Sequence, residues 1–124
     1  MDSQELKKQL QLQDRAVSII SEDGFYRATA VKTSTLAKTA QINHSLTGDK
    51  AQLLADFLSS AALFSSFLKG EERIILDISG RGDLSKINAE AMQNGETRGF
   101  IDANLSDFNY DNYDLSELTA TGIM

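Results

Sequence analysis

The alternation of apolar and polar residues predicts a β-hairpin near the start of the chain. Residues 16–21 hold a cluster of valine and isoleucine, and residues 25–32 form a second extended run. The two runs are separated by the pair Asp23-Gly24. Such a pair between extended runs is typical of a tight hairpin, because glycine readily adopts the positive φ that the turn needs.

One short helix is expected before this hairpin and another after it. Residues 2–12 contain leucines four positions apart, and Ser3 is a candidate N-cap for them. A second helix is expected to begin near Leu36. Its candidate N-caps are three consecutive hydroxyl residues: Thr33, Ser34 and Thr35.

The strongest helical pattern runs from Lys50 to Lys69. Asp49 is the expected N-cap, and Gly70 fits a C-terminal cap. Apolar residues cover more than one face of this segment, which predicts a largely buried helix. Small residues recur along it every three or four positions, which would let another element approach closely. They are Ala51, Ala55, Ser59, Ala62 and Ser66.

Three strands are expected after the long helix, over residues 72–79, 84–92 and 97–103. The last two are joined by an Asn-Gly pair that is typical of a hairpin turn. Gly99 lies inside the third strand, where a glycine commonly marks the close approach of another backbone. The order of hairpin, helix, helix and meander predicts an α+β fold, in which two helices pack against an antiparallel β-sheet made of the hairpin and the meander.

Composition narrows the class of protein. The chain has 124 residues, of which 41% are apolar and 24% charged, with no cysteine, one histidine and a net charge of −6. These values fit one folded domain and exclude disulfides, thiolate-ligated metal sites and a cysteine nucleophile. The chain lacks a long apolar segment and begins with polar residues, so we expect a cytoplasmic protein with no membrane partner. Its acidic balance argues against nucleic acid as a partner.

Charge is unevenly distributed along the chain. All 12 Lys and Arg residues lie before residue 99, whereas five acidic residues and no basic ones follow it. We therefore expect an acidic aromatic tail over residues 104–124. The tail is either a solvated end or an interaction segment that docks through its aromatic residues. These are Phe108, Tyr110 and Tyr113.

Candidate catalytic chemistry is scarce. Gly80 and Gly82 follow a predicted strand, but the third glycine and the Lys-Ser/Thr ending of a phosphate loop are missing. His44 lies in a predicted loop, and no pattern marks an acid and a nucleophile to act with it. The sequence therefore predicts no catalytic residue, no cofactor and no enzymatic activity.

Three blocks of residues carry a resemblance to a known family. The blocks are residues 14–33 with the Asp23-Gly24 turn, residues 53–72 ending in Leu68-Lys69-Gly70-Glu71-Glu72, and residues 78–100 with Gly80-Arg81-Gly82, Asn94-Gly95 and Arg98-Gly99-Phe100. Together they resemble the N-terminal core domain of heat shock protein 33, the redox-regulated bacterial chaperone. The resemblance covers residues 14–103. It implies a chaperone-like core domain over 14–103, incomplete relative to the family, after an N-terminal extension over residues 1–13. This chain has Asp83-Leu84 where the family usually has a proline, and it lacks the four cysteines of the family's C-terminal zinc module.

The resemblance implies an ATP-independent holdase, a stress-response chaperone that binds unfolded client proteins through apolar surface. Without cysteines, neither the zinc nor the thiol switch carries over, so no cofactor is expected. An incomplete sheet domain leaves an open edge, so a homodimer is expected. The candidate client-binding residues are Phe57, Phe64, Phe67 and Phe100, although helical aromatic residues more commonly belong to a core. The alternative is a truncated structural or dimerisation remnant that binds no client.

Overall fold

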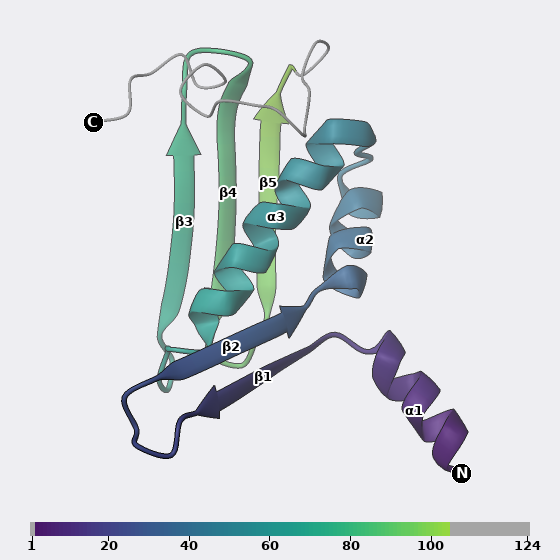
Figure 1. The fold of residues 1–124 in the computed structure, drawn as a ribbon. Coiled ribbons are helices and arrows are strands. Elements are labelled where there is room, and N and C mark those ends of the chain that lie inside the picture. The colour runs from purple at the N-terminus through teal and green to yellow at the C-terminus, as the bar shows by residue number, and fades with distance from the viewer. Residues whose placement is uncertain (1, 105–124) are drawn as a thin grey trace.

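The computed structural model describes residues 2–104 of the chain (Figure 1), so the tail predicted over residues 104–124 lies outside the described residues except for Asn104. Three helices and five strands follow one another in this part of the chain. They are α1 (Ser3–Leu12), β1 (Arg15–Ile20), β2 (Arg27–Lys32), α2 (Ser34–Asn43), α3 (Gly48–Ser65), β3 (Arg73–Ser79), β4 (Leu84–Met92) and β5 (Thr97–Ala103).

The predicted α+β fold is confirmed, and its strands form two separate antiparallel sheets. β1 pairs with β2 in one sheet, and β3, β4 and β5 form the meander in the order of the sequence. Both predicted hairpin turns contain a glycine in the left-handed region, with φ of +77° at Gly24 and +90° at Gly95. The two turns therefore have the backbone that their residue types predict.

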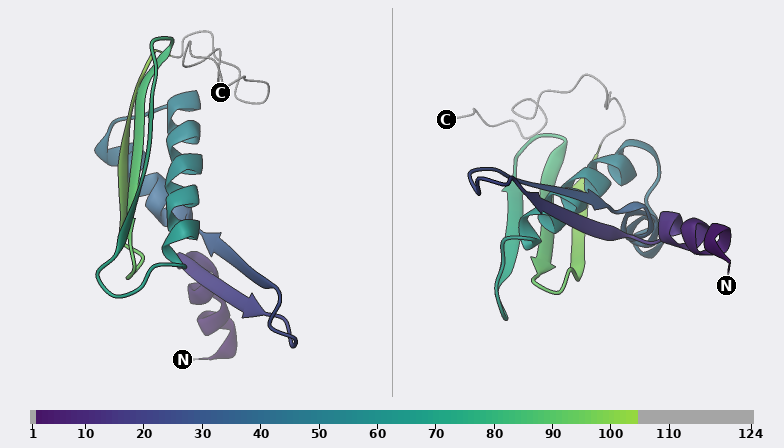
Figure 2. Two further views of the ribbon diagram at one scale, coloured as in Figure 1. Left: turned by 90° about the vertical axis from the view of Figure 1, so that its left-hand side faces the viewer. Right: turned by 60° about the horizontal axis from the view of Figure 1, so that its bottom comes forward.

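The core lies between α3 and the meander. Helix α3 runs along one face of the three strands, and α2 lies beside α3 and β5 (Figure 1; Figure 2, left). On α3 the buried side chains recur every three or four residues, and on β4 they largely alternate, as each element's geometry requires. The buried apolar residues are Leu53, Leu54, Leu58, Ala61, Leu84, Ile87, Ala89, Ala91 and Ala103.

Gly99 confirms the close backbone approach predicted from the sequence. A Cβ atom at this position would collide with the carbonyl oxygen of Asn88 on β4. It would also stand 3.0 Å from Leu58 Cδ2 and 3.1 Å from Ala89 Cα. Only glycine allows β4, β5 and α3 to pack this closely at Gly99, because two of the three neighbouring atoms belong to backbone.

The first helix is capped by a residue other than the one predicted. Helix α1 starts at Ser3, so its N-cap is Asp2, whose Oδ1 accepts the amide of Glu5 at 2.9 Å. The sequence therefore contains an N-cap carboxylate with a glutamate three residues later, and the prediction of Ser3 was wrong by one residue.

Helix α2 is capped from outside its own segment. Thr33 occupies the N-cap position, but its side chain makes no capping hydrogen bond and instead pairs with Ser59 Oγ of α3 at 2.6 Å. The cap comes from Asp14, whose two carboxylate oxygens accept the amides of Thr35 at 3.0 Å and Leu36 at 2.7 Å. Asp14 thus ties the start of β1 to the start of α2.

The long helix is shifted and less buried than predicted. It begins after Thr47, so Asp49 lies in the first turn rather than at the N-cap, and it ends at Ser65. Its C-cap is Ser66, so Gly70, which has a φ of +60°, lies beyond the cap position predicted for it. Leu63 and Phe64 near its end are exposed, because the meander covers only one side of the helix. The expectation of a largely buried helix therefore holds for its first part only.

Candidate functional site

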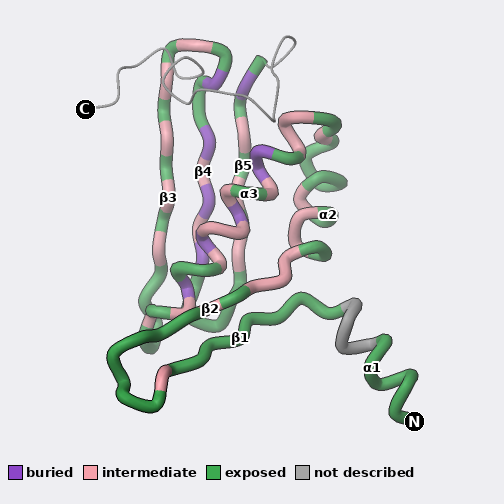
Figure 3. The backbone as a smooth tube through the Cα atoms, in the orientation of Figure 1, coloured by how far each residue is buried: buried purple, intermediate pink, exposed green. Residues whose placement is uncertain are grey.

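The hairpin β1–β2 presents an exposed apolar face. Val17 and Ile19 lie on this face opposite Ala30 and Ala28 of β2. Val17 is 53% exposed and Ile19 64%, and both alanines are exposed. In Figure 3 the hairpin is coloured as exposed over most of its length, in contrast to β4. We call Val17, Ile19, Ala28 and Ala30 the hairpin patch.

The opposite face of the hairpin is attached to the end of α3 through polar contacts. The guanidinium of Arg27 donates to the carbonyl oxygen of Ser66 at 3.0 Å and lies 4.8 Å from the ring centre of Phe67. Ser66 Oγ also donates to Thr29 Oγ1 at 3.4 Å. Every residue of β1 is exposed. The hairpin is thus held at its inner face without burying the apolar residues of the patch.

The turn of the hairpin holds two aromatic side chains in solvent. The carboxylate of Asp23 accepts hydrogen bonds from the hydroxyl of Ser21 at 2.5 Å and the amide of Phe25 at 3.0 Å. These two bonds lower the pKa of Asp23, the first more than the second. Phe25 and Tyr26, which follow, are among the most exposed apolar residues of the described chain. The turn therefore extends the apolar surface at the tip of the hairpin.

The structure separates the four predicted client-binding residues. Phe64 and Phe67, at the end of α3, are 48% and 58% exposed, and Phe67 contacts the hairpin through Arg27. Phe57 is half-buried against the core and borders a small cavity of about 160 Å³ between α3 and the meander. Of these four residues, Phe67 thus lies against the inner face of the hairpin, and Phe64 precedes it by three residues.

Phe100 lies on the face of the meander that points away from α3. It alternates on β5 with Gly99 and Ile101, which face the helix, and the ammonium of Lys86 stands 5.9 Å from its ring centre. The same outer face carries Glu90, whose carboxylate pairs with Arg73 at 3.0 Å and Arg98 at 3.1 Å. Phe100 is therefore set among charged neighbours, apart from the other three aromatics.

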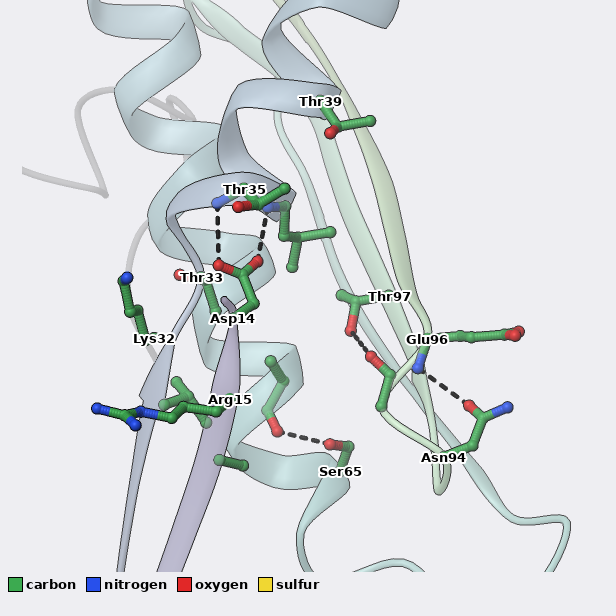
Figure 4. Close-up of a pocket in the computed structure, with 15 residues that line it drawn as sticks. Asp14, Arg15, Lys32, Thr33, Thr35, Thr39, Ser65, Asn94, Glu96 and Thr97 are labelled. Carbon is green, nitrogen blue, oxygen red and sulfur yellow. Dashed lines mark hydrogen bonds between the residues drawn. The ribbon is translucent and has the colours of Figure 1, made fainter. Parts of the chain in front are cut away.

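A cavity of about 520 Å³ lies between the hairpin, α2, α3 and the turn from β4 to β5 (Figure 4). Several of its polar groups make hydrogen bonds within the protein. Asp14 caps α2, Ser65 Oγ donates to the carbonyl oxygen of Ala62 at 2.6 Å, and Thr97 Oγ1 donates to that of Gly95 at 3.0 Å. The cavity brings together small hydroxyl side chains, without the nucleophile, base and orienting acid of a triad.

Other candidate chemistry is equally sparse among residues 2–104. His44 is exposed at the end of α2. Across this described part, no three His, Asp or Glu side chains cluster closely enough to hold a metal ion. None of the described helices combines the length and apolar character needed to cross a membrane.

The apolar residues of the hairpin were missed as site residues by the sequence analysis. Val17, Ile19 and Ile20 were assigned only to a strand, and Phe25 and Tyr26 only to its partner. The sequence did contain a signal for this exposed surface. The valine and isoleucine residues of β1 lie on both faces of the strand. A strand of a two-stranded sheet cannot bury both of its faces against a single helix.

Comparison with known proteins places the chain in a family. The sequence model of the family described as Hsp33 protein matches residues 14–124. A 33 kDa chaperonin of Bacillus cytotoxicus is 29% identical over 90 residues, which cover 73% of this chain and 31% of the relative. A 33 kDa chaperonin of Bacillus cereus is 28% identical over the same shares. The matched part thus spans about a third of these relatives' length. With nearly its whole length matched by the family's sequence model, the chain belongs to the Hsp33 protein family.

Proposed function

We propose that this protein is a chaperone domain of the holdase type, which binds unfolded proteins without ATP through its exposed apolar surface. The observation that carries the proposal is the hairpin patch, since Val17 and Ile19 remain more than half exposed. Fully burying such a side chain contributes about 1.5–3 kcal/mol, so the exposed half of each retains roughly half of that for a client. Contiguous exposed apolar residues commonly mark an interaction surface.

Phe64 and Phe67 add exposed aromatic surface at the end of α3, next to the inner face of the hairpin and separate from the hairpin patch. Phe67 adjoins the hairpin through Arg27, and an aromatic ring contributes a large apolar area when it is covered. Phe57 and Phe100 remain proposed contacts of a second rank, because one is half-buried and the other lies on the far face of the meander. Apolar burial supplies the binding energy in this scheme, so no nucleotide and no catalytic group are needed.

The redox switch of the family does not extend to this chain. The resemblance implies a zinc ion held by four cysteine thiolates, and none of the 124 residues is a cysteine. The residues present therefore do not fit that zinc site, and we derive no step through it. Client binding by this chain is proposed to be independent of oxidants, in the cytoplasm, with unfolded proteins as partners.

A second candidate function is dimerisation without client binding, as a structural remnant. The outer edge of β1 pairs with no other strand among residues 2–104, which favours self-association, and we propose that the chain forms a homodimer in either case. Neither nucleic acid nor a membrane is proposed as a partner. The two candidates differ in one respect, which is whether the apolar surface binds other proteins.

Suppression of aggregation distinguishes the two candidates. The full chain is mixed with a heat-denatured client without nucleotide, and light scattering is followed over time. We expect suppression by the wild type and weaker suppression by the double variant Val17→Thr with Ile19→Thr, which keeps β-branched residues in the strand. Ile75→Thr is the matched control, because Ile75 is similarly exposed at 51% but lies on the outer face of the meander. Lack of suppression at several-fold excess of the wild type would overturn the holdase proposal.

Alanine variants of the phenylalanines test how much each of them contributes to client binding. Phe64→Ala with Phe67→Ala is expected to weaken suppression, whereas Phe100→Ala is expected to leave most of it. If Phe100→Ala alone abolishes suppression, the client binds the outer face of the meander and the proposed surface is wrong.

A further inference from the structure

The hairpin patch is bordered at the open end of the hairpin by two basic residues. Alternate residues of a strand share a face, so Arg15 lies on the same face of β1 as the patch residues Val17 and Ile19. Lys32 is the cross-strand partner of Arg15 and therefore lies on this face too. The outer face of the hairpin thus consists of one basic pair followed by the apolar patch.

The two basic side chains stand side by side without an anionic partner in the described part of the protein. Neither Arg15 nor Lys32 forms an ion pair with another residue between positions 2 and 104. Figure 4 shows the guanidinium and the ammonium on the side of the hairpin that faces away from the turn between β4 and β5. Like charges directly opposite each other on a sheet are destabilising. An anionic group placed between them relieves this repulsion.

The other charged residues of the hairpin region are directed elsewhere. Asp14 precedes this basic pair, but both of its carboxylate oxygens accept amides of α2. Arg27 lies on the inner face, where its guanidinium binds the end of α3. Glu22 and Asp23 lie in the turn, at the far end of the two strands. The positive charge of the outer face is therefore concentrated at its open end.

From this arrangement we propose that the hairpin selects extended apolar segments of unfolded clients that carry an acidic residue at one end, with the carboxylate between Arg15 and Lys32. This inference rests on the proposed function and names the class of client segment. Guanidinium and ammonium groups both donate charge-assisted hydrogen bonds to a carboxylate. The pairs Arg15–Lys32 and Ile19–Ala28 lie about 13 Å apart along the strands, so an extended segment of about five residues spans the basic pair and the patch.

The basic pair acts on the choice of segment more than on the strength of binding. Exposed ion pairs are weak, and each raises affinity by about fivefold at most. Apolar contacts with the hairpin patch therefore supply most of the affinity, whereas the charges discriminate between segments of similar apolar content. Because the two basic groups face solvent, the preference should weaken as ionic strength rises.

Peptides that differ in a single residue test this preference on the full chain. Each has a short alternating valine–threonine segment with blocked ends and a fluorophore, and bears aspartate, asparagine or lysine at one end. A second set has the variable residue at the other end, because an extended segment can lie in either direction. In fluorescence anisotropy at low salt, we expect the aspartate peptide of at least one set to bind roughly fivefold more tightly than its asparagine counterpart. Equal binding of these two peptides in both sets, or no binding of either, would overturn the inference.

Charge variants test whether the basic pair causes the preference. Arg15→Gln with Lys32→Gln is expected to remove it, and Arg15→Glu with Lys32→Glu to reverse it in favour of the lysine peptide. Arg81→Gln with Lys38→Gln is the matched control, because it removes the same two charges from the turn after β3 and from α2. This control should keep the preference. A preference for aspartate that survives Arg15→Gln with Lys32→Gln would show that another group binds the carboxylate, and the inference would be wrong.

Failure of this inference is distinguishable from failure of the proposed function. Val17→Thr with Ile19→Thr should weaken the binding of every peptide by a similar factor, since it changes the patch and leaves the basic pair. A wild type that suppresses aggregation without preferring the aspartate peptide would overturn the inference and leave the holdase proposal standing. A wild type that does not suppress aggregation would overturn both.

Discussion

Replacing Gly99 by alanine tests the packing of the core at its closest point. In the middle of a strand, glycine is ordinarily less stable than alanine by about 0.5–1 kcal/mol, and Gly99 does not have a positive φ. Backbone preference alone therefore predicts that Gly99→Ala stabilises the protein. The structure predicts the opposite sign, because the new methyl group meets the carbonyl oxygen of Asn88 and the Cα of Ala89.

The magnitude follows from the atoms that would have to move. Adding a methyl group to a filled site costs about 1–3 kcal/mol when the neighbours are rigid. Two of the neighbours are backbone atoms of β4, and the third, Leu58, is fully buried. After the gain in backbone preference is subtracted, we expect a net loss of about 1–2 kcal/mol.

Urea unfolding of the full chain measures this difference. Gly99→Ala is expected to lower the midpoint at an unchanged slope, which reports a change in stability rather than in the denatured state. The control is Asp102→Ala on the same strand, whose side chain lies on the exposed outer face and whose loss should change stability by about 0.5 kcal/mol or less. If Gly99→Ala proves as stable as the wild type or more so, the close approach of β4 to β5 does not explain this glycine.

Two further predictions concern the ends of the hairpin. Asp14→Ala removes the acceptor of two α2 amides and is expected to lower the free energy of unfolding by about 1–2 kcal/mol in urea titrations; no loss would mean that α2 is capped otherwise. The lowered pKa of Asp23 means that its contribution to stability is present above the ordinary aspartate range and is lost as pH falls through the folded-state value. The stability difference between wild type and Asp23→Asn should therefore shrink on acidification, and a difference that grows instead would contradict the assigned hydrogen bonds.

Much of the secondary structure could be predicted because local residues decide it. The strands over 84–92 and 97–103 have the predicted bounds, since the Asn94-Gly95 pair sets the turn between them and apolar alternation sets their faces. The cap of α2 could not be predicted in the same way. Its acceptor, Asp14, lies 21 residues before Thr35 in the sequence, and only the path of the hairpin brings the two together.

The solvent exposure of the aromatic side chains could not be predicted from the local sequence pattern. Phe57 and Phe64 lie seven residues apart on one side of α3, and the sequence assigns them the same environment. In the structure Phe57 packs against the core cluster, with Ile78 and Leu84 bordering the same cavity, whereas Phe64 is 48% exposed. Whether an aromatic residue belongs to a core or to a surface depends on which strand lies beside it.

The same reasoning explains why the proposed surface lies on the hairpin. A valine or isoleucine in a strand predicts burial, and in β4 that expectation holds for Ile87 because α3 covers it. In β1 the identical pattern leaves Val17 and Ile19 exposed. The inner face of the hairpin is held by Arg27 and Ser66, and no helix or strand within residues 2–104 covers the outer face. Apolar residues that the fold does not bury lower its solubility, so their presence calls for a partner. On this chain the exposed face of the hairpin is therefore the surface that we propose for a client protein.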